Sequence, residues 1–250
     1  KMDNLANYFS CGIVQNSISE LQLSELHCDG NFNIINIYHL KNTLKILSCC
    51  GICGIDQKNV EKLHLEHLKC DNNPKIKNLN HMKESLKVLE CRQTIDIPKK
   101  YGFMIGDKGI SKLKLREIYI GGNTNISDLN HMKDTLKLLD ISHVYYYSYT
   151  QSKISQSGTS NLKLHTAILD RSLDKIDLDN MADSLKVLKL IRDTDFINLR
   201  SKLSILKVSH LYLQKCSFDS LHDFFGDDTI TLDTLTLDQC NYGNGISNIV

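Results

Sequence analysis

The sequence predicts an α/β solenoid, in which short repeats stack and each adds one strand to a parallel sheet. The pattern Leu-x-x-Leu-x-(Leu, Ile or Cys) recurs along the 250 residues, and the longer string LNHMK occurs at 79–83 and again at 129–133. Such recurrence is typical of solenoids, because one repeat cannot bury its own apolar face and needs neighbours to cover it. The pattern, with Ile118, Ala167 or Val208 in place of a leucine in three of the repeats, begins at ten positions: Leu23, Leu44, Leu65, Leu86, Leu115, Leu136, Leu164, Leu185, Val208 and Leu232.

Each repeat is expected to contain a strand with one buried face. Successive side chains of a strand point to opposite sides, so the fourth and sixth positions, such as Leu68 and Cys70, share one face. The steps between repeat starts are 21, 21, 21, 29, 21, 28, 21, 23 and 24 residues. We therefore expect about ten parallel strands, one for each repeat, spaced about 4.8 Å apart.

The segments between the strands predict short helices or 3₁₀ turns. They carry spaced apolar residues, such as Ile76, Leu79 and Met82, that can anchor one or two helical turns. We expect a curved horseshoe over residues 1–250, with the sheet on its concave face and the helices, turns and loops on its convex face. The two longest steps indicate loop insertions near 95–104 and 144–158, which leave the stack without breaking it.

The ninth position of the repeat completes a known motif. An Asn side chain there can bond backbone groups where the chain turns away from the sheet. The pattern L-x-x-L-x-L-x-x-N/C is that of leucine-rich repeats, so the chain resembles a leucine-rich repeat protein from about Ser17 to Cys240. Asn or Cys holds this position in five repeats, at Asn31, Asn73, Asn123, Cys216 and Cys240.

Two further similarities narrow the resemblance. The segments CGIDQKNVEKL, from Cys53, and IGDKGISKL, from Ile105, are similar to the cysteine-containing subclass of these repeats, which often follows an F-box in ubiquitin-ligase adaptors. The CGID…NLNHMK phrasing, with abundant Asn, Ile and Lys, resembles the leucine-rich repeat proteins of giant DNA viruses of amoebae, the mimivirus-like group. The resemblance implies a non-enzymatic scaffold that binds a host or viral protein.

Composition argues against several other classes of protein. The net charge of +1 gives no preference for nucleic acid, and no apolar run approaches the ~18–20 residues of a membrane helix. No signal peptide precedes the nine cysteines, so we expect reduced thiols in the cytoplasm, which is the host cytoplasm for a viral protein, with virion association as a variant. No nucleophile elbow, P-loop or Gly-rich dinucleotide turn occurs, so we expect neither catalysis nor a cofactor.

The stretch LSCCGICGID at 47–56 raises the question of a metal or redox site. Cys50 and Cys53 form a C-x-x-C, but zinc needs four converging ligands and the chain has no second such pair. Cys53 aligns with Cys11, 42 residues earlier, which leaves Cys50 as the cysteine without a counterpart. We expect core thiols and no metal, although a metal or redox role for Cys50 stays an alternative. The sixth position of the repeat holds Cys28, Cys49, Cys70 and Cys91.

Three histidines take one place in alternate repeats. His39, His81 and His131 are separated by two repeats each, or about 10 Å and more, so one metal ion cannot bind them together. A repeated turn or surface role is the better interpretation.

The predicted concave face mixes charged, apolar and aromatic side chains at the third and fifth positions, which favours a protein partner over nucleic acid. The alternative is that this face only packs. The predicted contacts are His67, Lys69, Val88, Glu90, Glu117, Tyr119, Leu138 and Asp140.

The loop insertion near 144–158 offers a second, aromatic contact, unless it packs on its own solenoid. Its tyrosines are Tyr145, Tyr146, Tyr147 and Tyr149.

Two other functions stay open. Neither end of the sequence has a polar capping repeat, so the chain is either a fragment or a virion-associated or structural component that self-associates through uncapped ends. The second function is substrate recognition in an F-box-type ubiquitin-ligase adaptor, which needs further sequence upstream of Ser17.

Overall fold

The computed structural model describes residues 13–95, 104–143, 152–171, 173–192, 196–218 and 230–242. The chain divides into two compact units, which we call unit 1 (1–127 with 144–153) and unit 2 (128–143 with 154–250). Most of the two predicted loop insertions lies outside the described residues. The single solenoid over 1–250 stays a prediction, and each unit is described by itself.

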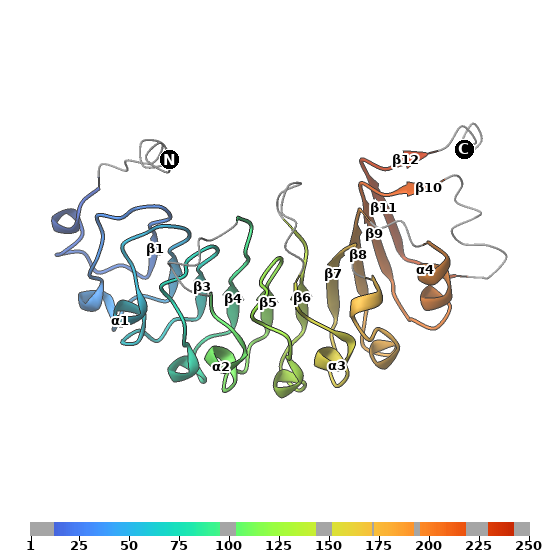
Figure 1. Cartoon of the computed structure of the whole chain (residues 1–250), viewed down its shortest axis with the longest axis horizontal. Coiled ribbons are helices and arrows are strands. Elements are labelled where there is room, and N and C mark those ends of the chain that lie inside the picture. Colours follow the sequence, from blue (N-terminus) through green and yellow to red (C-terminus); the bar gives the residue numbers. More distant parts are fainter. Residues whose placement is uncertain are drawn as a thin grey trace. The chain divides into compact units, whose positions relative to one another are not determined.

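Unit 1 contains a parallel sheet in which strands follow one another in chain order (Figure 1, blue to green). Each strand begins at the third position of a predicted repeat. The register pairs fourth positions with each other, as in Leu47 with Leu68 and Leu68 with Leu89, which confirms the predicted stacking. The strands are β1 (Glu25–His27), β2 (Ile46–Ser48), β3 (His67–Lys69), β4 (Val88–Glu90) and β5 (Glu117–Tyr119).

Unit 2 repeats this arrangement with mostly longer strands, again parallel and in register (Figure 1, yellow-green to red). Leu188 pairs with Leu211, and Leu211 pairs with Leu235, so fourth positions again lie side by side. The strands are β6 (Leu138–Asp140), β7 (Thr166–Asp170), β8 (Val187–Ile191), β9 (His210–Gln214) and β11 (Thr234–Asp238). A separate parallel pair joins β10 (Ser217–Phe218) to β12 (Asn241–Tyr242).

Short helices connect the strands, and the prediction of short helices or 3₁₀ turns is confirmed. In unit 1 the 3₁₀ helix η1 (Gln15–Ser17) precedes β1, and the connections include 3₁₀ helices η2 (Tyr38–Leu40) and η3 (Asn80–Met82) and α-helices α1 (Gln57–Val60) and α2 (Asp107–Ile110). In unit 2 they include η5 (Asn130–Met132), α3 (Gln156–Thr159), η6 (Leu173–Lys175), η7 (Asp179–Met181) and α4 (Phe196–Leu203). Both units are therefore α/β, as a repeat solenoid requires.

The core lies between the sheet and the connecting segments of each unit. Leu68 and Cys70 of unit 1 are buried, as are Leu79 and Met82 of the next connection. Burial of each leucine contributes about 1.5–3 kcal/mol. Cysteine at the sixth position acts as a small apolar residue, because burial raises the pKa of the Cys70 thiol well above its ordinary value and keeps it neutral.

The ninth-position asparagines join neighbouring repeats as the sequence suggested. Asn123 is fully buried at 0% exposure, and its Nδ2 donates to the carbonyl oxygens of Cys91 at 3.0 Å and Ile105 at 3.2 Å. Its Oδ1 accepts from the backbone N–H of Asn125 at 2.9 Å. Asn73 makes the same set of bonds one repeat pair earlier. These amides satisfy backbone groups that the turn out of the sheet would leave buried and unpaired.

The connecting segment that contains α2 approaches the preceding connecting segment closely at Gly109. The carbonyl of Gly109 accepts from Leu79 N–H at 2.8 Å, and a Cβ on Gly109 would lie 2.0 Å from the carbonyl oxygen of Lys77. Asn59 occupies the matching position of α1, where its Oδ1 accepts from the Ile37 N–H at 3.2 Å. A side-chain bond thus replaces the backbone bond where the residue is not glycine.

Candidate interaction face

The outward side chains of β3, β4 and β5 form one array on unit 1. The register places His67 beside Val88 and Val88 beside Glu117, and it places Lys69 beside Glu90 and Glu90 beside Tyr119. All of these side chains are half-buried, whereas the residues between them on each strand are buried. Strand alternation thus brings the unit 1 part of the predicted concave-face contacts together.

Glu90 lies at the centre of this array. Its Oε1 is 3.0 Å from His67 Nε2, and its Oε2 accepts from Arg92 Nη1 at 2.7 Å and lies 3.6 Å from Lys69 Nζ. Burial opposes ionisation of the Glu90 carboxyl, but the hydrogen bond from Arg92 and the charge of Lys69 outweigh burial and lower its pKa below the ordinary value. The carboxylate is therefore ionised at neutral pH.

Arg92 completes the array and was not predicted from the sequence. Its guanidinium lies 4.7 Å above the centre of the Tyr119 ring and 3.5 Å from Asp71 Oδ2. The Tyr119 hydroxyl donates to Glu117 Oε2 at 3.0 Å. We call His67, Lys69, Glu90, Arg92 and Tyr119 the strand-face cluster.

A sequence signal for Arg92 and Asp71 does exist. Lys69 and Glu90 are 21 residues apart, and Asp71 and Arg92 are also 21 apart, which is the commonest repeat step. Opposite charges at one repeat spacing indicate ion pairs between neighbouring strands. The Arg92 and Asp71 side chains are 11% and 12% exposed, so the pair lies at the boundary between surface and core, where burial raises the pKa of the Asp71 carboxyl despite the backbone hydrogen bond from Arg92.

The remaining predicted contacts have different positions. Leu138 and Asp140 belong to β6 of unit 2, and Leu138 is half-buried. Asp140 is only 6% exposed, and its Oδ1 accepts from the Ser142 N–H at 2.7 Å where the chain leaves the strand. Asp140 thus offers little exposed surface, and its role as a partner contact stays a prediction. The predicted loop contacts Tyr145, Tyr146, Tyr147 and Tyr149 lie outside the described residues.

Cys50, the cysteine without a counterpart in the other repeats, lies where its surroundings keep the thiol protonated. Its N–H donates to Asp29 Oδ1 at 2.6 Å, and its Sγ lies 3.9 Å from Ser48 Oγ. Burial and the nearby Asp29 and Asp71 carboxylates raise the pKa of the Cys50 thiol to about 12. A thiol that stays protonated is a poor nucleophile and a poor metal ligand.

Cys53 makes its contact with Cys49, and Cys50 and Cys53 are both free thiols. Both Cys49 and Cys53 are buried, and Cys53 Sγ donates to the Cys49 carbonyl oxygen at 3.1 Å. The described cysteines are free thiols, while Cys11 lies outside the described residues. In the ranges that the structure covers, no group of three or more His, Cys, Asp or Glu side chains is arranged to hold a metal ion.

The repeated histidines make contacts between neighbouring connections. His39 Nε2 lies 2.9 Å from the Ile18 carbonyl oxygen, and His81 Nε2 lies 3.1 Å from that of Val60. Partial burial lowers the pKa of His81, which favours the neutral ring. These contacts support the predicted turn role of the histidines.

Comparison with known proteins assigns no relative, because no protein-family model and no curated protein matches the sequence. Among the described residues, the helices are all too short to cross a bilayer.

Proposed function

We propose that the chain is a leucine-rich repeat scaffold that binds a protein partner through the strand-face cluster and does not catalyse a reaction. The cluster carries the proposal because its side chains are held in place before any partner arrives. Arg92, Glu90 and Tyr119 fix one another by a 2.7 Å hydrogen bond and a cation–π contact of 4.7 Å. Side chains ordered in advance lose less conformational entropy when a partner binds.

The chemistry of the cluster supports a protein partner over other ligands. Tyrosine and arginine are enriched among the residues that dominate protein–protein binding energy. The acidic and basic groups offset one another, since Lys69 and Arg92 lie close to Glu90 and Asp71, whereas a nucleic-acid surface would need an excess of cations. The groups pair with one another and include no nucleophile beside a general base, which supports a non-enzymatic role.

The test replaces Tyr119 and Glu90 and follows the proteins captured from native cells. Tyr119→Ala combined with Glu90→Lys removes the aromatic anchor and reverses the central charge. We expect the binding of a specifically captured protein to weaken about tenfold or more. Quantitative mass spectrometry of captured proteins provides the measurement, and thermal unfolding of the variant checks that it is folded.

A matched control changes a charge on the connecting segments. Lys58→Glu lies in α1, away from the strands, and should leave capture unchanged. A photo-reactive residue placed at Val88 should cross-link the same protein, while one placed at Lys58 should not. Capture that is identical for the wild type and the Tyr119/Glu90 variant, or cross-linking that is equal at both positions, overturns the proposal.

A second function, self-association, is favoured by exposed apolar side chains in the first described repeats. Phe32 is 51% exposed, Ile35 is 61% exposed and Ile52 is 58% exposed. Sedimentation velocity over a range of protein concentrations separates the two functions. A concentration-dependent oligomer that Ile35→Lys and Ile52→Lys abolish supports an assembly component, whereas a monomer at all concentrations leaves the scaffold role.

The free thiols also bear on where the protein acts. Many unpaired cysteines are typical of proteins in reducing compartments, so the described free cysteines support a cytoplasmic location, in a host cell for a viral protein.

A further inference from the structure

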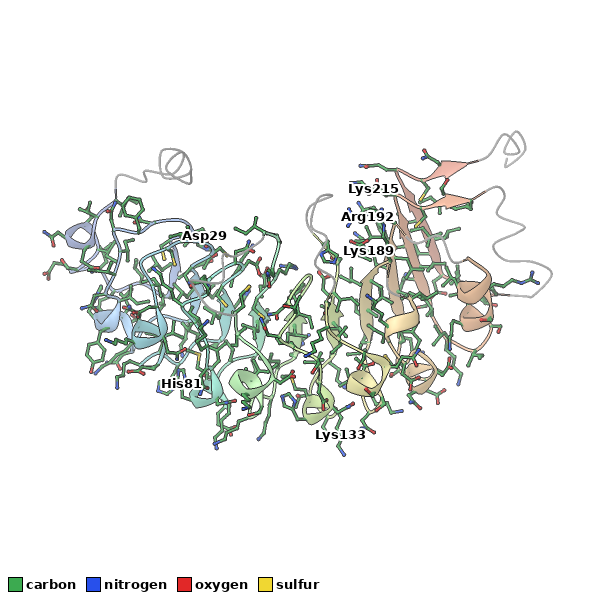
Figure 2. The ribbon with its side chains drawn as sticks, viewed as in Figure 1. Asp29, His81, Lys133, Lys189, Arg192 and Lys215 are labelled. Atoms are coloured by element: carbon green, nitrogen blue, oxygen red, sulfur yellow. The ribbon has the colours of Figure 1, made fainter. Side chains whose placement is uncertain are left out.

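A groove of about 560 Å³ opens on unit 1 among the connecting segments of neighbouring repeats. Its walls come from α1 and the residues that follow it, from η3 with the residues before it, and from Lys112, two residues after α2. Figure 2 shows His81, one of the lining residues, on η3. The volume lies within the ~300–1,000 Å³ of many small-molecule sites.

Side-chain amides hold the walls of this groove in place. Gln57 accepts from the Lys77 N–H at 2.8 Å and donates to the Asn78 carbonyl oxygen at 2.8 Å. Asn80 accepts from the Lys112 N–H at 2.8 Å and donates to the Lys108 carbonyl oxygen at 2.8 Å. The backbone positions from which Lys77 and Lys112 extend are therefore fixed by bonds to the neighbouring repeat.

The charges that line the groove are mostly positive. Lys62, Lys77 and Lys112 all line it, and Glu61 is the only carboxylate among the described lining residues. Glu61 lies 3.7 Å from Lys62, whereas within the described ranges no carboxylate pairs with Lys77 or Lys112. Lys77 is an exposed residue whose partial burial lowers the pKa of its ammonium, and no neighbouring anion offsets that effect. An anion bound in the groove would supply the missing partner.

We propose that this groove binds a phosphate group, either as a free ion or as the phosphate of a phosphorylated side chain. Three ammonium groups against one carboxylate leave an excess of about two positive charges, which matches the charge of about −1.5 to −2 on a phosphate monoester. Lysine binds phosphate as a point charge and needs no bidentate geometry. The site uses connecting segments and none of the strand-face cluster, so it goes beyond the proposed partner-binding function.

Isothermal titration calorimetry of the full chain tests the groove at low ionic strength, where such attraction is screened least. The two probes are inorganic phosphate and a short peptide with one phosphoserine. We expect saturable binding of one probe molecule per chain, weakened about tenfold by Lys77→Gln with Lys112→Gln. Tighter binding of the peptide assigns the groove to a phosphorylated side chain, and equal binding assigns it to phosphate alone.

Two matched variants make the result specific. Lys58→Gln with Lys83→Gln removes the same charge from the same connecting segments outside the groove, and it should change the dissociation constant less than about twofold. Glu61→Gln should tighten binding about twofold to fivefold, because it removes the competing carboxylate. The proposal is overturned when neither probe binds saturably or when the control pair weakens binding as much as the groove pair. None of these readouts depends on the strand-face cluster.

Discussion

Unit 1 and unit 2 make the same turn out of the sheet with different residues. At the eighth position of the repeat, four residues of each unit have backbone φ angles between 49° and 72°. Glycine adopts such left-handed angles freely, whereas other L-residues are strained by about 1–2 kcal/mol. Unit 1 uses Gly30, Gly51, Asn72 and Gly122, and unit 2 uses Arg171, Arg192, Lys215 and Gln239.

This difference shows that bonding within the sheet holds the left-handed turn even at residues that do not favour it. Most unit 2 strands span five residues, while those of unit 1 span three. Sheet bonding continues into the turn in both units, since Arg192 N–H donates to the Gln214 carbonyl oxygen and Gly51 N–H to that of Asp71, both at 2.8 Å. The same bond thus forms whether or not the residue is glycine, and in unit 2 it holds Arg192 and Lys215, both labelled in Figure 2, in the left-handed turn.

The largest expected effect compares the seventh-position carboxylates of the two units. The Asp170 side chain is 1% exposed and pairs with Arg192, whose Nε donates at 3.1 Å. Asp170→Ala leaves the Arg192 guanidinium buried without this carboxylate and should cost about 3–5 kcal/mol of unfolding free energy. Asp71→Ala in unit 1 should cost about 1–2 kcal/mol, because Arg92 keeps its bond to Glu90.

Urea unfolding followed by circular dichroism measures both losses. Asp170→Asn, which keeps the shape and one acceptor oxygen, serves as the control and should be less harmful than Asp170→Ala. Equal losses of unfolding free energy in Asp170→Ala and Asp71→Ala would contradict this prediction, because they would show that the two units bury their carboxylates to the same extent.

The second effect compares the ninth position. In unit 1, Asn123 donates to the Cys91 carbonyl and also accepts from Asn125 N–H. In unit 2, Cys216 Sγ donates to the equivalent carbonyl of Leu190 at a longer 3.8 Å. Asn123→Ala should cost about 2–3 kcal/mol, because it leaves buried backbone groups unpaired, and Cys216→Ala about 1 kcal/mol. Thermal unfolding of both variants checks the order, and a greater loss at Cys216 contradicts it.

The third effect concerns the turn itself. A Cβ on Gly51 would meet no atom within 4 Å, so Gly51→Ala tests only the backbone and should cost about 1 kcal/mol. Arg171→Gly should stabilise unit 2 by about 0.5 kcal/mol, because the relief of strain exceeds the entropy that glycine adds to the unfolded chain. Chemical denaturation measures the change in unfolding free energy of both variants. A loss in Gly51→Ala with a gain in Arg171→Gly supports the comparison, and a loss in Arg171→Gly contradicts it.

The smallest effect is the pH dependence that Glu90 gives to unit 1. The folded pKa of Glu90 lies below the unfolded value of about 4.3, so its ionised form stabilises the fold above that pH. This contribution is lost as the pH falls through the folded pKa. The difference in unfolding free energy between wild type and Glu90→Gln should thus be constant near neutral pH and shrink in acid. Denaturation at several pH values measures it, and a difference that grows in acid reverses the sign.

The strands could be predicted because their signal is local. Strand alternation and the repeat step alone place β1 to β5, which begin at the third position of each repeat. The strand-face cluster was predicted only in part, because the fifth position identified Lys69, Glu90 and Tyr119 but not Arg92 at the seventh. Arg92 comes two residues after Glu90, beyond the end of β4. It belongs to the cluster because Glu90 Oε2 accepts a hydrogen bond from its guanidinium at 2.7 Å.

The sequence by itself determined the repeat period, the positions of β1 to β9 and β11 and most of the apolar residues that become buried, since these depend on spacing within one repeat. Only the tertiary structure decided which charges meet across repeats, how the groove around Lys77 and Lys112 is formed, and why Arg171 and Arg192 hold left-handed turns. The physical reason is that side-chain pairing and backbone strain depend on atoms more than twenty residues away, which a local pattern does not contain.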